Sequence, residues 1–146
     1  MSELDPRKTL ISIDGVGAFD HITRASMLSA LRCQPRAKEL LPFVLMFYGD
    51  ASEYLWRDDD GNSHVIKQAD GGEQGDPLML ALYAIGQHMA LVQIHSRLED
   101  GESVFAILDD IYFVCKPERV AELFTITQVA LRNHAGIEVN VGKTRL

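Results

Sequence analysis

Three aspartates in this sequence lie at the ends of apolar runs, where carboxylates are costly to bury. Asp109 and Asp110 are adjacent and interrupt the otherwise apolar stretch 105–114, and Asp14 directly follows the apolar run 9–13. Burying neighbouring carboxylates is unfavourable unless a cation or a hydrogen-bond donor compensates for the lost hydration. A divalent metal is the simplest such cation. If the apolar runs are neighbouring strands, Asp14 and Asp109 converge on one metal site.

The apolar runs themselves predict the strands that would position these acids. Residues 9–13 are rich in β-branched side chains, and 105–114 contains no glycine or proline. Short unbroken runs of this kind are typical of buried strands. The stretch 105–114 therefore predicts a hairpin in which the acidic pair lies where the chain turns back.

The rest of the chain predicts helices packed against these strands. Residues 18–21 form a turn, and Thr23 is the N-cap of a helix over 24–32. The other predicted elements are a helix through 43–48, a hairpin of strands 52–57 and 64–68, a long helix from Pro77 to about Arg97, a helix from Pro117 to about Gly136 and a strand over 137–139. This order favours an α+β fold, with helices on one face of a mostly antiparallel sheet and the carboxylates on the other.

Composition indicates one domain spanning residues 1–146, large enough to bury about two-thirds of its unfolded surface. No apolar run reaches the ~20 residues of a membrane helix, so no membrane partner is expected. Two unpaired cysteines, Cys33 and Cys115, suggest buried thiols in a reducing intracellular compartment, without distinguishing nucleus from cytoplasm. The formal charge of −7 argues against strong autonomous nucleic-acid binding.

Four segments, in this order, carry a resemblance to a known family: Ile13–Asp20, Gly71–Leu78, Leu108–Asp110 and Gly136–Thr144. They resemble the palm motifs of reverse transcriptases. The motifs are an acid followed by Ala-aromatic, a Gln-Gly-x-Pro-Leu loop, a paired-aspartate turn and a Gly-apolar-x-apolar-Asn segment before Lys-Thr. The residues within these motifs are most similar to those of non-LTR retrotransposon enzymes. Single motifs are weak, whereas all four in order are specific.

The resemblance implies a polymerase palm that adds dNTPs to a DNA primer on an RNA template, using two Mg²⁺ ions or, in their place, Mn²⁺. In-line phosphoryl transfer depends on positioning and charge neutralisation, which two metal ions supply. Asp14 and Asp109 would be the metal ligands, and Asp110 an adjacent catalytic acid. The alternative for all three is a role as turn or helix-capping residues.

Further residues take candidate roles from the same resemblance. Phe19 would lie under the incoming sugar, or else be an ordinary core residue. Gln74 and Gly75 would let the backbone approach template or nucleotide closely, or else form a flexible helix-entry loop. Lys143 would donate charge or a proton to the departing pyrophosphate, or else be solvated. The sequence departs from the motifs at Ile107, where an aromatic residue is usual, and at Asp76, where serine is common.

Three other functions stay open at this point. An RNA-directed RNA polymerase palm shares the acid geometry, although the Gln-Gly-Asp-Pro-Leu loop favours the reverse transcriptase. An inactive relic of a retroelement, or a binding module derived from one, is the second. A nucleotidyl cyclase is the most distant. The chain starts almost on the first predicted strand and ends just after Lys143, so we expect it to lack the fingers and thumb segments.

Overall fold

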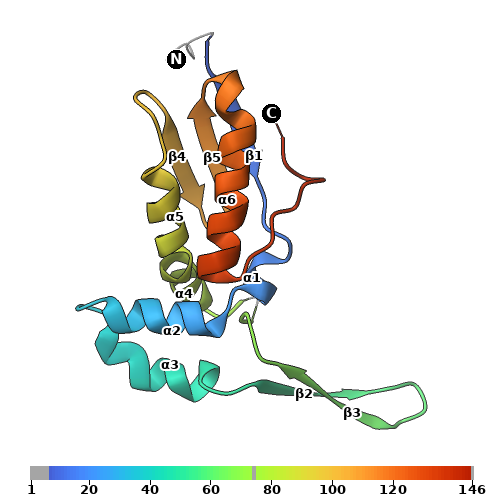
Figure 1. Cartoon of the computed structure of the whole chain (residues 1–146). Helices are drawn as coiled ribbons and strands as arrows, with labels where there is room; N and C mark the ends of the chain where they lie inside the picture. The colour runs from blue at the N-terminus through green and yellow to red at the C-terminus, as the bar shows by residue number, and fades with distance from the viewer. Residues whose placement is uncertain (1–6, 74, 146) are drawn as a thin grey trace.

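The computed structural model describes residues 7–73 and 75–145. Figure 1 shows how the elements are arranged. In chain order they are β1 (Thr9–Ile13), α1 (Ala18–His21), α2 (Arg24–Cys33), the 3-10 turn η1 (Lys38–Leu40), α3 (Leu41–Tyr48), β2 (Ser52–Arg57), β3 (Ser63–Gln68), α4 (Met79–Gly86), α5 (His88–His95), β4 (Ser103–Ile107), β5 (Asp110–Cys115), the 3-10 turn η2 (Pro117–Arg119) and α6 (Val120–Ala135).

Three of the predicted strands form one antiparallel sheet with the order β1-β5-β4, and the predicted hairpin β2–β3 forms a separate two-stranded sheet. The strand β5 is central, with Ile13 of β1 opposite Ile111 and Ile107 of β4 opposite Asp110. The hairpin β4–β5 and the first strand are therefore confirmed. Because β1 and β5 are direct neighbours, the residues at this shared end of the two strands are brought together.

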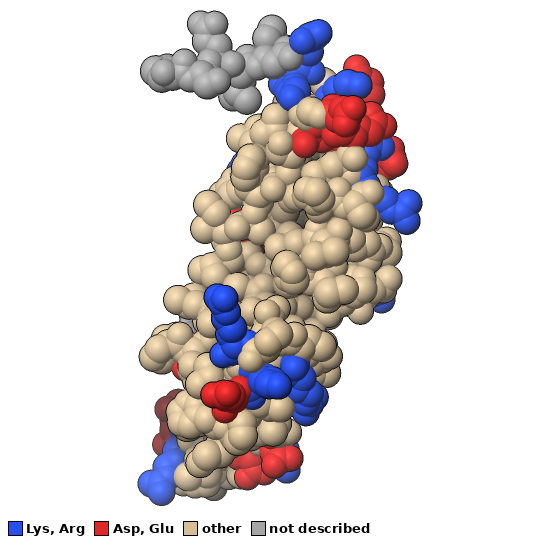
Figure 2. All heavy atoms as spheres, turned by 90° about the vertical axis from the view of Figure 1, so that its left-hand side faces the viewer, with Lys and Arg blue, Asp and Glu red and all other residues tan. Residues whose placement is uncertain are grey.

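The outer surface beside β4 and α5 carries few charges in its middle. Figure 2 shows Lys, Arg, Asp and Glu side chains gathered toward the two ends of this face, with uncharged residues between them. A nucleic-acid backbone is held by basic side chains that neutralise successive phosphates. This face offers no continuous basic track, in keeping with the acidic composition.

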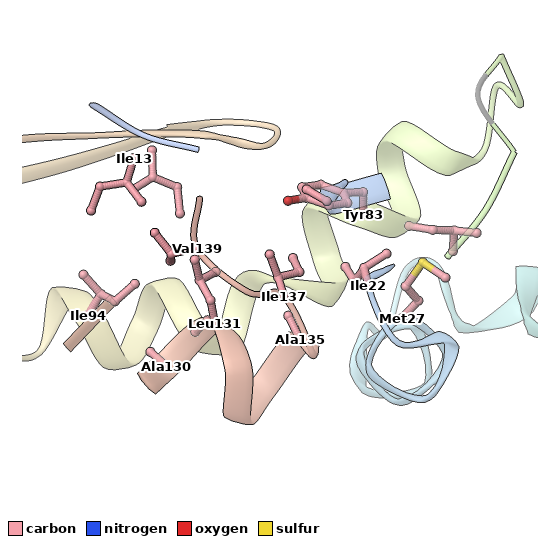
Figure 3. Packing of buried hydrophobic residues seen from close by; sticks show 14 of the residues in the cluster. Ile13, Ile22, Met27, Tyr83, Ile94, Ala130, Leu131, Ala135, Ile137 and Val139 are labelled. Atoms are coloured by element: carbon pink, nitrogen blue, oxygen red, sulfur yellow. The ribbon is translucent and has the colours of Figure 1, made fainter. Parts of the chain in front are cut away.

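Helices α5 and α6 cover one face of the sheet, as the α+β prediction requires. Figure 3 shows Ile13 above Ile94 of α5 and Leu131 of α6, with Val139 filling the space between. All four are buried. The other face of the sheet stays open, and Leu10, Phe105 and Ile107 are exposed there. The sheet is thus buried on one side only, and the open side is free for function.

Helices α2 and α3 pack beside the helical layer, and the hairpin β2–β3 extends away from it (Figure 1). The Thr23 hydroxyl accepts a hydrogen bond from the Ser26 amide at 3.3 Å, which confirms the predicted N-cap. Met27, Leu28 and Leu31 form the buried face of α2 against the core. No helix within 7–73 and 75–145 is long and apolar enough to cross a membrane.

Two helical predictions were wrong in detail. Residues 18–21 form a single helical turn, α1, instead of a loop turn. The long helix predicted to reach Arg97 is divided into α4 and α5 at Gln87 and ends at His95. Gly86, beside the break, packs closely against α2, since a Cβ there would lie 2.9 Å from the Ile22 and Met27 side chains.

Two further predictions were also wrong. Residues 137–139 form no regular strand. Among the described residues, isolated bridges of Gly15 with Val139 and of Ser12 with Arg145 join this last segment to β1 and to the residues that follow β1. The intervening residues turn back at Asn140, which interrupts the ladder. Of the two cysteines expected to be buried, Cys115 is buried in β5, but Cys33 is exposed because it ends α2 on its outer side.

Candidate active site

The three aspartates lie at one end of the sheet. Asp109 occupies the turn between β4 and β5, and Asp110 is the first residue of β5. Asp14 follows the last residue of β1, so that continuing the β1–β5 register by one position sets it opposite Asp110. Directly opposed residues of antiparallel strands point to the same face. The structure therefore brings Asp14 and the acidic turn together at the ends of adjacent strands.

Asp14 has an unusual environment for a carboxylate. Its side chain is 19% exposed, and its Oδ2 is buried and makes an ion pair in place of a regular hydrogen bond. The only cation in reach within the described residues is the Lys143 ammonium, whose Nζ lies 3.2 Å from that oxygen. Lys143 is itself 65% exposed, so water screens much of the attraction. A buried carboxylate oxygen that is paired with an exposed, screened lysine fits a site that a further cation could complete.

A turn near the end of the chain explains why Lys143 reaches Asp14. The Asn140 amide donates to the Asp14 carbonyl at 2.8 Å. The Lys143 and Thr144 amides then both donate to the Asn140 carbonyl, which closes the turn. The main chain thereby holds Lys143 beside the end of β1.

Tyr83 of α4 lies beneath the acids. It is almost fully buried, and in Figure 3 its hydroxyl points toward the turn of the β4–β5 hairpin. Burial, followed by the charges of Asp109 and Asp14, raises the pKa of Tyr83 above its ordinary value. The phenol is therefore neutral at physiological pH. Both carboxylates thus lie close enough to the Tyr83 hydroxyl to act on its pKa.

This raised pKa makes stability depend on alkaline pH. In the unfolded chain a tyrosine loses its proton near pH 10, whereas folded Tyr83 keeps it. The stabilisation is therefore complete below about pH 10 and is lost as the pH rises further. We expect urea unfolding at pH 8 to 11 to show a falling free energy of unfolding above pH 10. Tyr83→Phe should reduce that slope, and an unchanged slope would contradict the assignment.

An open cavity of about 420 Å³ adjoins the acidic turn. It brings together Phe19, Gly75 and Asp109, three of the residues singled out in the sequence. The other lining residues are Glu73, Asp76, Pro77, Met79 and Leu80. Gln74 lies outside the described residues. The cavity has the size of a small-molecule site, and three acidic residues, Glu73, Asp76 and Asp109, contribute to its lining.

Phe19 forms the aromatic wall of this cavity. Its ring stacks on Tyr83, with centroids 4.5 Å apart and an angle of 24° between the planes. Gly75 has φ 97, a conformation that favours glycine, and a Cβ there would meet no atom within 4 Å. Gly75 is thus required by its backbone conformation and not by crowding around its Cα.

Two glycines, Gly71 and Gly72, attach the loop before α4 to α1 and to the residue that follows α1. The Gly71 amide donates to the Ile22 carbonyl at 2.7 Å, and the Gly72 amide donates to the Phe19 carbonyl at 3.0 Å. A Cβ on Gly71 would lie 2.3 Å from the Asp20 carbonyl oxygen. Only glycine allows this approach, so the Gly-Gly pair holds the loop and Phe19 in one unit.

Arg24 is a functional candidate that the sequence did not reveal. It is buried, and its guanidinium donates to the Asp50 carbonyl, to the Gly71 carbonyl at 3.1 Å and to the Ser52 hydroxyl at 2.9 Å. It also lies over the Tyr48 ring, 5.3 Å from its centroid. Arg24 therefore ties both ends of the β2–β3 hairpin to α2. An arginine in the first turn of a helix gives no sequence signal for such a role.

Asp76, which departs from the serine of the motif, has a structural role here. Its Oδ1 accepts from the Leu78 amide at 2.8 Å, at the entry to α4, and its Oδ2 accepts from the Tyr48 hydroxyl. Burial, together with this hydrogen bond to Asp76, raises the pKa of Tyr48. The aspartate thus accepts two hydrogen bonds, one at each carboxylate oxygen, and the second of them comes from Tyr48.

The acids do not form a complete metal cage by themselves. Among residues 7–73 and 75–145, no group of three or more His, Cys, Asp or Glu side chains is gathered as a metal site. Mg²⁺ commonly takes only one or two protein carboxylates and fills its remaining positions with water and substrate phosphates. The pair Asp14 and Asp109 fits that pattern, and the Oδ2 of Asp14, which is buried and paired with the exposed Lys143, supports it.

A three-stranded antiparallel sheet, helices on one face and an acidic hairpin turn at one end together define a polymerase palm-like fold. Telomerase, a reverse transcriptase, has this fold too, and the chain is similar in structure to telomerases from Candida. Apo telomerase from Candida tropicalis, truncated from its C-terminal domain, matches with a TM-score of 0.73 and 15% identity over 99% of this chain and 31% of that chain.

Two more solved structures give the same result. Apo telomerase from Candida tropicalis matches with a TM-score of 0.74 and 13% identity over 97% of this chain and 28% of its own. Telomerase from Candida albicans, in complex with a fragment of telomeric RNA, matches with a TM-score of 0.71 and 14% identity. This match covers 96% of this chain and 28% of the telomerase chain. The chain thus spans about 30% of the telomerase chains it matches. No protein-family model and no curated protein matches the sequence.

Proposed function

We propose that this chain is the palm of a retroelement reverse transcriptase of the non-LTR type, an RNA-directed DNA polymerase that adds dNTPs to a DNA primer. The proposal rests mainly on one observation: Asp14 and Asp109 lie at the same end of adjacent strands, beside an open cavity that Phe19 lines. The reverse-transcriptase-like fold supports the reaction class. Two of the similar telomerases were solved with telomeric RNA, which supports an RNA template as the partner.

Each residue at the sheet end has a part in this proposal. Asp14 and Asp109 would hold two Mg²⁺ ions, or Mn²⁺ in their place, which neutralise charge on the reacting phosphates. Asp110, on the open face beside them, adds negative charge that strengthens cation binding. Lys143 lies at the rim of the site on an exposed side chain, so it can turn from Asp14 toward a departing pyrophosphate. Gln74 and Gly75 would contact template or nucleotide along the loop.

Phe19 is proposed to exclude ribonucleotides. Its ring is held by stacking on Tyr83 and forms a rigid wall of the cavity near Asp109. In any form of the protein that extends a primer, Phe19→Val should admit ribonucleotides and raise their use relative to dNTPs by at least about tenfold, or about 1.4 kcal/mol. Comparative incorporation kinetics measure this. An unchanged dNTP-to-rNTP ratio in an active variant would assign Phe19 to the core alone.

Metal binding provides the direct test of the proposed site. Mn²⁺ is titrated into the 146-residue chain, and binding is measured by calorimetry or electron paramagnetic resonance. We expect the wild type to bind Mn²⁺ and Asp109→Asn to weaken the affinity by at least about tenfold. The matched control is Asp60→Asn, which changes the net charge equally in the exposed β2–β3 loop. Equal affinities in the Asp109→Asn variant and the wild type would refute the metal site. A loss as large in Asp60→Asn would reduce the effect to overall charge.

A further inference from the structure

The acidic turn contains an unfavourable backbone conformation. Leu108, which precedes Asp109, has φ 56, and it is the sole non-glycine residue with positive φ in the described part of the chain. L-residues other than Asn and Asp rarely adopt this left-handed conformation, because the Cβ crowds the carbonyl oxygen. A leucine keeps it only where surrounding contacts hold the backbone.

One buried side chain supplies such a contact from another element. Gln87 is 2% exposed and lies at the junction of α4 and α5. Its Nε2 donates to the Leu108 carbonyl at 2.8 Å, across 21 residues of sequence. The backbone amide of Gln87 donates to the Tyr83 carbonyl at 3.0 Å, and the backbone carbonyl of Gln87 accepts from the Leu91 amide at 3.2 Å. The helices thus fix the glutamine on both sides.

The other end of the Gln87 side chain is unsatisfied. Its Oε1 is buried without a hydrogen-bond donor. A buried acceptor without a partner is unfavourable, and an apolar side chain of the same shape would avoid that loss. Packing alone therefore does not account for a glutamine here. The compensating feature is the hydrogen bond from Nε2 to the turn.

We propose that Gln87 is a positioning residue for the acidic turn. By holding the Leu108 carbonyl, it fixes the plane of the peptide that leads into Asp109 and so directs that carboxylate toward Asp14. The break between α4 and α5 gives the side chain its path to the turn. This proposal rests on the proposed function as far as metal binding is concerned, whereas the holding of the turn stands independently.

The test is a double-mutant cycle. Gln87→Met keeps the approximate shape of the side chain and removes the amide donor. Leu108→Gly allows the left-handed backbone without help. The wild type, both single variants and the double variant are compared by Mn²⁺ titration and by urea unfolding. Gln93→Met is the matched control, because Gln93 lies on α5 and contacts His134 instead of the turn.

The expected result is loss and rescue. Gln87→Met should weaken Mn²⁺ binding about tenfold, as expected for a residue that orients a ligand. The double variant should recover most of that affinity, and Gln93→Met should stay within about twofold of the wild type. In urea, Gln87→Met should lower the unfolding midpoint more in the wild-type background than in the Leu108→Gly background.

Other outcomes overturn the proposal. If Leu108→Gly does not restore the affinity lost in Gln87→Met, Gln87 acts only as a core residue. Equal midpoint losses in both backgrounds lead to the same conclusion. If the wild type binds no Mn²⁺, the proposed metal site fails, and the urea comparison alone decides whether Gln87 holds the turn. If Gln87→Met does not fold, folding of the double variant supports the proposal and its failure to fold contradicts it.

Discussion

Phe113→Ala should lower the free energy of unfolding by about 3–5 kcal/mol. Phe113 is 0% exposed in the central strand β5, and its register partners are Ile11 on β1 and Val104 on β4. Truncation removes apolar contacts and leaves a cavity. Because β5 is paired with a strand on each edge, the sheet cannot shift to close that cavity. Small proteins are stable by about 5–15 kcal/mol in total. The loss would therefore be a large part of the stability of this chain.

Phe105→Ala is the matched control. It is the same substitution on the neighbouring strand, but Phe105 is 56% exposed on the open face of the sheet. We expect it to cost less than about 1 kcal/mol. Urea unfolding followed by circular dichroism measures both variants. Similar losses at the two positions would mean that the face described as open is covered in solution.

The sequence predicted most strands and helices because local patterns determined them. The runs that became β1, β4 and β5 are short, apolar and bounded by turn residues, and Thr23 marked the start of α2. Pro42 lies in the first turn of α3, and Gly49 directly follows its last residue, as is usual for these residue types. These signals act within one element, so a single chain carries them in full.

The errors arose where contacts from other elements decide the backbone. The apolar periodicity of 77–97 continues through Gln87, and only the hydrogen bond to Leu108 shows why the side chain turns inward there. Residues 137–139 are apolar enough for a strand, but the turn at Asn140 ends their pairing with β1. Sequence patterns contain no information on such partners.

The candidate site was predictable in part. The motifs indicated Asp14, Phe19, Gly75 and Asp109, and the structure places these residues around one end of the sheet. The supporting residues were not indicated. Arg24, Tyr83 and Gln87 lie in or between helices whose sequences suit packing equally well, and only their partners in space identify them.

The 146-residue chain by itself should not extend a primer. Polymerisation requires a grip on a primer–template whose affinity scales with the number of phosphates neutralised by Lys and Arg. Here 21 acidic residues oppose 14 basic ones, and the face in Figure 2 shows no continuous basic track. Mg²⁺ at the proposed site would offset charge only beside Asp14 and Asp109. The duplex would therefore be repelled before contacts form.

The measurement is an extension assay with homopolymer RNA template, DNA primer, dNTP and Mg²⁺, run at low and at physiological salt. We expect no product above background under either condition. Lowering the salt normally strengthens nucleic-acid binding by basic proteins, but it lengthens the reach of repulsion from an acidic one. Asp109→Asn is run in parallel to identify contaminating activity. Extension by the wild-type chain that disappears in Asp109→Asn would show that the palm grips its substrate through local contacts despite its net charge. The metal-binding residues would then suffice for catalysis without a basic groove.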